Sequence, residues 1–106
     1  MSPPAAREGE GDRTIVRVTV RGRVQGVGYR AWCADEARRR GLSGWVRNRA
    51  SGTVEALLAG EARQVAQMVE ACRRGPHGAR VDHLALQEVS DAVPAAAAGF
   101  AILATL

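Results

Sequence analysis

Alternation of apolar and polar residues along the chain predicts five β-strands. From Ile15 to Arg21, valine occupies every second position, and arginine or threonine follows each valine. A period of two is typical of a strand with one buried face, so the valines should lie beneath a layer of helices. The four other segments with strand-like composition are 42–49, 53–59, 81–89 and 99–104.

Two segments have helical periodicity instead, 31–40 and 61–74. In the second, apolar residues recur at i, i+3, i+4 and i+7 from Val65, which places them in one stripe along a helix. Gly75-Pro76 should end this helix, because proline cannot continue it. The first helix has three arginines near its carboxyl end, where positive charge is favourable.

Short features between these segments predict how the strands meet. Ala50-Ser51-Gly52 is a tight turn that should join the second and third strands in a hairpin. Val81 is out of phase with the leucines that follow it, which indicates a bulge. In the last strand we expect Phe100 and Ile102 to point inward.

The order of elements predicts a ferredoxin-like α+β sandwich, βαββαβ, with one extra C-terminal strand. In this fold an antiparallel sheet carries both helices on one face. We expect the strand that bears Asn48 to lie next to the first strand. The length suits one domain, 13–106, and the low apolar content of residues 1–12 predicts a disordered tail.

Composition narrows the class of partner. All fifteen basic residues are arginine, against eleven acidic residues, and the formal net charge of +4 favours anionic partners. Cys33 and Cys72 lack metal-ligand spacing and should be reduced packing residues. The sequence has no signal segment and no apolar run of about 20 residues, which predicts a cytoplasmic protein without membrane association.

The segment from Gly22 to Arg30 carries the clearest candidate chemistry. Three glycines within 22–28 allow the backbone to curl and to approach a ligand closely. Backbone amides beside a helix N-terminus can bind an anion, and Arg23 and Arg30 flank the segment with guanidinium groups suited to phosphate. A nucleotide P-loop needs a lysine, which the chain lacks. The pattern predicts a different kind of phosphate loop, although an ordinary strand-to-helix turn has similar composition.

Two motifs closely resemble the signatures of the acylphosphatase family. Residues 22–30, Gly-Arg-Val-Gln-Gly-Val-Gly-Tyr-Arg, resemble the first signature. Residues 44–55, Gly-Trp-Val-Arg-Asn-Arg-Ala-Ser-Gly-Thr-Val-Glu, resemble the second. Segments 75–81 and 100–102 are similar to the family's approach to the fourth strand and to its closing strand. The resemblance therefore covers nearly all of the predicted domain.

The resemblance implies an enzyme that hydrolyses the carboxyl–phosphate bond of a small acyl phosphate, with no metal and no cofactor. In the family an arginine binds the phosphoryl group and an asparagine orients the attacking water; these positions are Arg30 and Asn48 here. The resemblance also implies that loop amides hold the phosphate oxygens. Those amides belong to Arg23, Val24, Gln25, Gly26, Val27, Gly28 and Tyr29.

Other interpretations remain open at this point. A basic sheet with exposed Arg17, Arg21 and Arg47 could bind nucleic acid, although its first strand lacks the aromatic rings that stack on bases. A phosphate sensor without turnover, or a domain of a larger carbamoyl-phosphate-handling protein, is a third interpretation. We favour a monomeric enzyme that binds no nucleic acid.

Three residues of types that often act in catalysis or metal binding are expected to have no such role here. His77 and His83 have no metal-ligand spacing and should be surface residues. Cys33 lies three residues after Arg30, but inside a predicted helix and without an adjacent histidine. Because a nucleophilic cysteine needs its thiolate form, we expect Cys33 to serve packing.

Overall fold

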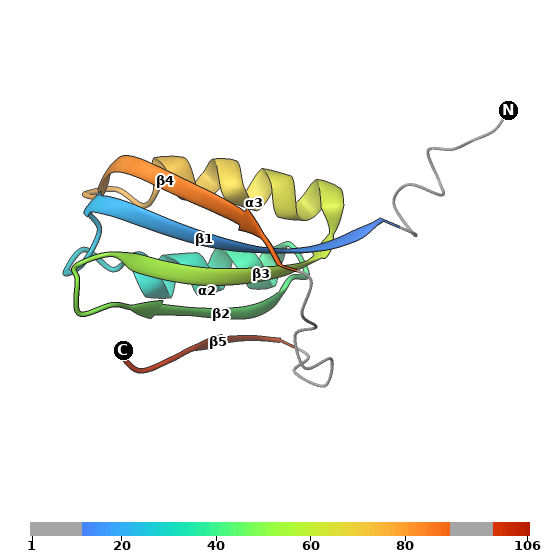
Figure 1. The fold of residues 1–106 in the computed structure, drawn as a ribbon, viewed down its shortest axis with the longest axis horizontal. Coiled ribbons are helices and arrows are strands. Elements are labelled where there is room, and N and C mark those ends of the chain that lie inside the picture. Colours follow the sequence, from blue (N-terminus) through green and yellow to red (C-terminus); the bar gives the residue numbers. More distant parts are fainter. Residues whose placement is uncertain (1–11, 90–98) are drawn as a thin grey trace, which may run out of the picture.

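In the computed structural model, which describes residues 12–89 and 99–106, a five-stranded sheet lies against two helices (Figure 1). The predicted tail, apart from Asp12, lies outside the described residues. The elements in chain order are β1 (Arg13–Arg23), α2 (Tyr29–Arg39), β2 (Ser43–Asn48), β3 (Val54–Glu61), α3 (Ala62–Arg74), β4 (Arg80–Glu88) and β5 (Phe100–Ile102).

The strands are arranged in the order β4-β1-β3-β2-β5. The first four are antiparallel to their neighbours, as predicted, whereas β5 runs parallel to β2 and makes the sheet mixed. Both helices cover the same face (Figure 1). The chain therefore has the ferredoxin-like fold with one added strand.

The prediction that the strand bearing Asn48 lies next to the first strand was wrong. That strand, β2, pairs with β3 and β5, and β3 separates it from β1. The physical reason is that the tight turn makes β3 the hairpin partner of β2, while both edges of β1 are occupied by β3 and β4.

The core lies between the helices and the facing side of the sheet. The valines of β1 at positions 16, 18 and 20 are at most 5% exposed, which confirms the strand's predicted orientation. Burying each such side chain stabilises the fold by about 1.5–3 kcal/mol relative to exposure. From the helices, the core receives Tyr29, Cys33, Ala34, Ala37, Val65, Met68, Val69 and Cys72.

Helix α2 begins two residues earlier than the periodicity predicts. Gly28, with φ of 80°, adopts the left-handed conformation and serves as its N-cap. The early start places Arg30 in the first turn of α2, so helix geometry fixes its direction. At the other helix, Gly75 with φ of 69° and Pro76 end α3 as predicted.

The last two strands contain one confirmed expectation and one error. The register of β4 against β1 shifts where Arg21 and Gly22 face His83 and Val81, which is the expected bulge. In β5, Phe100 is buried, but Ile102 is 45% exposed rather than inward. Ile102 faces an open cleft, described below, so no side chain covers it.

Neither α2 nor α3, the helices of the described part of the chain, is long and apolar enough to cross a membrane.

Candidate active site

The loop between β1 and α2 curls through two left-handed glycines. Gly26 and Gly28 have φ of 76° and 80°, values that a residue with a side chain adopts only with strain. Left-handed residues at alternating positions are typical of backbone concavities whose amides bind anions. At Gly26 and Gly28 an added Cβ would meet no atom within 4 Å, so backbone conformation alone favours glycine there.

The N-terminus of α2 adds to this site. Its N-cap makes no side-chain hydrogen bond, and its first turn contains no acidic residue. The first amides of a helix carry partial positive charge and have no partner within the helix. The start of α2 therefore offers helix N-terminal amides beside the loop, a position that favours a bound anion.

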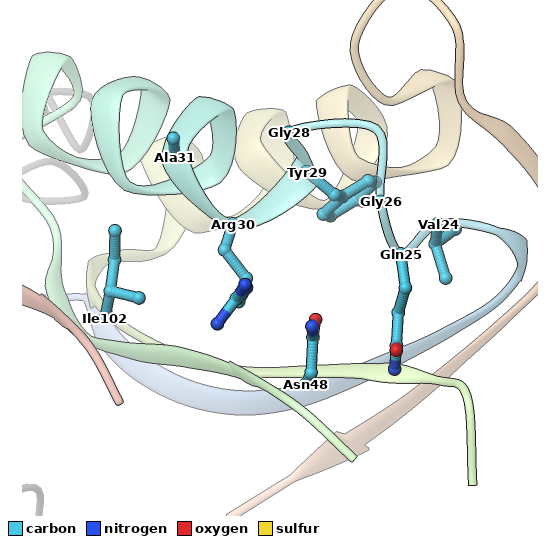
Figure 2. A pocket seen from close by; sticks show the side chains of 9 residues that line it. All are labelled: Val24, Gln25, Gly26, Gly28, Tyr29, Arg30, Ala31, Asn48 and Ile102. Atoms are coloured by element: carbon cyan, nitrogen blue, oxygen red, sulfur yellow. The ribbon is translucent and has the colours of Figure 1, made fainter. Parts of the chain in front are cut away.

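Arg30 projects from the first turn of α2 toward β2 (Figure 2). Within the described residues it makes no salt bridge and no side-chain hydrogen bond, in contrast to Arg47 and Arg49, which contact Glu55. A half-buried guanidinium with free donors suits a planar or tetrahedral oxyanion.

Asn48 is the last residue of β2 and approaches Arg30 from the opposite wall (Figure 2). Its Oδ1 atom is buried and has no hydrogen-bond partner among the described residues. A buried polar atom without a partner costs about 1–3 kcal/mol, so such atoms are usually retained for a purpose. Asn48 therefore presents a free acceptor beside Arg30.

Together the loop, α2, β2 and β5 enclose a cleft of about 280 Å³. The cleft brings together most of the predicted site residues, although the chain separates Arg30 and Asn48. Its lining consists of Val24, Gln25, Gly26, Gly28, Tyr29, Arg30, Ala31, Asn48 and Ile102.

Two predicted residues lie outside this lining. Arg23 is exposed at the end of β1, opposite Arg80 of β4. Val27 packs against the core. Conversely, Ala31 and Ile102 line the cleft and were not predicted as site residues. The resemblance to a closing strand was the sequence feature that could have pointed to Ile102.

The aromatic and thiol side chains next to the cleft point into the core. The hydroxyl of Tyr29 donates to the carbonyl oxygen of Cys72 at 2.7 Å, and burial raises the pKa of this phenol far above its ordinary value. Contact with the Cys72 thiol, together with burial, raises the pKa of Cys33. Cys33 is fully buried, so it packs as predicted and is no accessible nucleophile.

The opposite face of the sheet is less basic than the sequence suggests. Glu55 is 8% exposed and contacts Arg17, Arg47 and Arg49 at 3.4, 3.0 and 3.1 Å. These arginines are therefore partly neutralised, which weakens the nucleic-acid interpretation. Both histidines are exposed, as predicted.

Comparison with known proteins shows which family the chain resembles. The acylphosphatase family model matches residues 16–102. An acylphosphatase of Azorhizobium caulinodans is 54% identical over 91 residues, 86% of this chain and 96% of that protein. An acylphosphatase of Rhodopseudomonas palustris is 56% identical over 96 residues, which cover 88% of this chain and 97% of that protein.

A solved structure gives the same result for the fold. The structure of an acylphosphatase from Coxiella burnetii superposes with a TM-score of 0.80 and 30% identity, covering 90% of this chain and 97% of that one. By its sequence and its fold, the chain belongs to the acylphosphatase family of enzymes.

Proposed function

We propose that this acylphosphatase hydrolyses the carboxyl–phosphate bond of small acyl phosphates, with Arg30 and Asn48 as its catalytic residues. The observation that carries the proposal is their convergence. A guanidinium and a buried amide oxygen, neither with a partner in residues 12–89 or 99–106, face the same cleft beside a loop with two left-handed glycines.

The phosphoryl group would bind between Arg30 and the loop. Backbone amides from Arg23 to Tyr29 and the first turn of α2 would donate to its oxygens, and Arg30 would add charge-assisted hydrogen bonds. The folded loop and the start of α2 would hold these donors before the substrate binds. They can therefore stabilise charge on the equatorial oxygens in the transition state without further reorganisation.

Asn48 would orient the attacking water. Its free Oδ1 can accept a hydrogen bond from the water, while its Nδ2 can donate to a phosphate oxygen. An amide cannot remove a proton near neutral pH. The water would attack phosphorus, its proton would pass to a phosphate oxygen, and the P–O bond to the acyl group would break, which yields carboxylate and inorganic phosphate.

The leaving group makes further acid–base catalysis unnecessary in this scheme. A carboxylate leaves readily, so catalysis reduces to positioning and electrostatic stabilisation. Among the described residues, those that line the cleft include no Asp, Glu or His. This composition supports a mechanism in which the phosphate itself accepts the proton.

Several properties accompany the proposal as expectations. We expect activity without a metal ion or cofactor, a monomer in solution, a cytoplasmic location and no nucleic-acid partner. The recognised group is the phosphoryl end, so we expect broad acceptance of acyl groups.

Hydrolysis of an aromatic acyl phosphate, followed by absorbance with EDTA present, tests the proposal. Wild type should turn over rapidly, while Arg30→Ala and Asn48→Ala should each lose at least ~10²-fold in kcat/KM, the scale of removing one principal transition-state contact. Arg63→Ala, which removes an exposed arginine of α3 outside the cleft, is the control matched in charge.

The outcomes separate the possible explanations. A wild type no faster than buffer would contradict turnover and favour a phosphate sensor. Equal losses in Arg63→Ala and Arg30→Ala would show that net charge, rather than the position of Arg30, sets the rate. Loss of activity on adding EDTA would contradict the metal-free mechanism.

A further inference from the structure

Gln25 lies in the phosphate loop, but its side chain is directed toward the β2–β3 hairpin (Figure 2). Its Nε2 atom donates to the carbonyl oxygens of Arg49 and Thr53, both at 2.9 Å. Both partners are acceptors, so the nitrogen, and not the oxygen, must face them. The orientation of this amide is therefore fixed by chemistry.

The two acceptors flank the turn of the hairpin. Arg49 N donates to Thr53 O at 2.9 Å, and Gly52 N donates to Arg49 O at 2.9 Å, so the backbone already closes the turn. Gln25 adds a hydrogen bond to each of the same two carbonyls. Both hydrogens of its amide nitrogen are thereby used, and its nitrogen cannot also donate to a bound phosphate.

Arg49 directly follows Asn48, so this double contact links the two walls of the cleft. One wall is the loop, whose amides and neighbouring Arg30 would hold the phosphate; the other is the end of β2, which carries Asn48. The walls are far apart in sequence, and the hydrogen bonds of Gln25 span 24 and 28 residues. Their relative position depends on contacts of this kind.

We propose that Gln25 is a positioning residue that fixes Asn48 at the correct distance from the phosphate loop. The inference rests on the proposed function and deepens it. Gln25 acts on the orientation of the attacking water through Asn48, whereas Arg30 and the loop amides bind the phosphate. Loss of its side chain therefore reduces kcat and leaves phosphate affinity largely intact.

Two substitutions of similar size test this role. Gln25→Met keeps the length and removes both hydrogen bonds, and Gln25→Glu places a carboxylate against two carbonyl oxygens. Displacement of a catalytic group by ~1 Å can cost ~10²-fold, so we expect a fall in kcat of about 10- to 100-fold. The inhibition constant of inorganic phosphate should change less than ~3-fold in Gln25→Met. Gln87→Met, on exposed β4, is the matched control and should retain wild-type kcat.

A double-mutant cycle distinguishes positioning from a general loss of stability. If Gln25 acts through Asn48, Gln25→Met should have little further effect on kcat in an Asn48→Ala background, because coupled residues are non-additive. All assays are run well below the melting temperature of each variant, measured by circular dichroism.

Three results would overturn the inference. Full additivity of the two substitutions, or a rise in the phosphate inhibition constant that parallels the fall in kcat, would show that Gln25 acts independently of Asn48. A Gln25→Met enzyme as active as Gln87→Met would show that the side chain of Gln25 has no positioning role. An Asn48→Ala enzyme with normal kcat would instead contradict the proposed function itself, so the two failures are distinguishable.

Discussion

Replacing Tyr29 by phenylalanine removes one hydroxyl that joins the two helices. The hydroxyl donates to Cys72 O at 2.7 Å, and Tyr29 is 3% exposed. In a continuous helix, Cys72 O would accept from the amide four residues later, which is Pro76 and has no N–H. The phenol therefore supplies the hydrogen bond that the chain cannot make locally.

The expected loss of stability follows from this geometry. Removing one partner and leaving a buried carbonyl unsatisfied costs about 1–3 kcal/mol, rather than the ~1 kcal/mol net value of a typical hydrogen bond. We expect Tyr29→Phe to lower the free energy of unfolding by about 2 kcal/mol at pH 7. For a domain of this size that corresponds to a fall in Tm of roughly 8–16 °C.

The same substitution should change the response to alkali. Burial raises the pKa of Tyr29 in the folded protein, so above the ordinary value of 10.0 the unfolded chain loses a proton that the native state keeps. Stability contributed by the neutral phenol is complete below that pH and declines above it, by about 1.4 kcal/mol per pH unit. The chain has one tyrosine, so Tyr29 is its only phenol. It has no lysine, whose ordinary pKa lies in the same range and would complicate the alkaline titration.

Urea unfolding of both proteins at pH 7, 9, 10 and 11 measures the two effects together. The wild type should be more stable by about 2 kcal/mol at pH 7, and this difference should shrink to roughly 0.6 kcal/mol at pH 11, because only the wild type loses stability through the phenol. Equal stability at pH 7, or a difference that does not change with pH, would refute the reasoning.

Two further predictions concern the core. Gly44→Ala should lower the free energy of unfolding, measured in urea, by about 3 kcal/mol or more, because a Cβ at this position, where φ is 135°, would lie 1.8 Å from Leu57 O. Gly52→Ala is the control, since φ there is 100° and no atom lies within 4 Å of the added Cβ, and it should cost about 1 kcal/mol. Similar losses in the two variants would contradict the steric argument. The thiols of Cys33 and Cys72 should react with a chromogenic disulfide reagent only after denaturation, since both are buried, and rapid labelling of the native protein would disprove that burial.

Much of the fold is contained in local patterns. The periodicity of the valines in β1 and of the apolar stripe that starts at Val65 predicts which face of each element is buried, and Gly75-Pro76 marks the end of α3. The hairpin of β2 and β3 was predicted, but the position of β3 between β1 and β2 and the parallel direction of β5 could not be predicted in this way. Strand pairing depends on contacts between distant segments, which a period of two does not encode.

The site residues likewise include some that local motifs predict and others that depend on contacts between distant segments. Arg30 and Asn48 were identified through motif resemblance, and the structure brings them to one cleft. The direction of the Gln25 side chain was not predictable, because it depends on two carbonyls that only the folded hairpin places together. Ile102 was assigned to the core, because its alternation with Phe100 indicates a face and cannot reveal that the face ends in a cleft.

The short strand β5 also bears on how the folded protein avoids self-association. Without it, β2 would be an edge strand with unpaired amides and carbonyls, and such edges template pairing with other chains. The opposite edge, β4, is protected by a bulge and by charged residues such as Arg80 and Asp82. Three residues of β5 pair with β2, a hydrogen bond from Arg38 to Phe100 O adds to this contact, and backbone hydrogen bonds join Gly99, Leu103 and Leu106 to residues 44–50. Detachment of this C-terminal segment would expose β2 as an aggregation-prone edge.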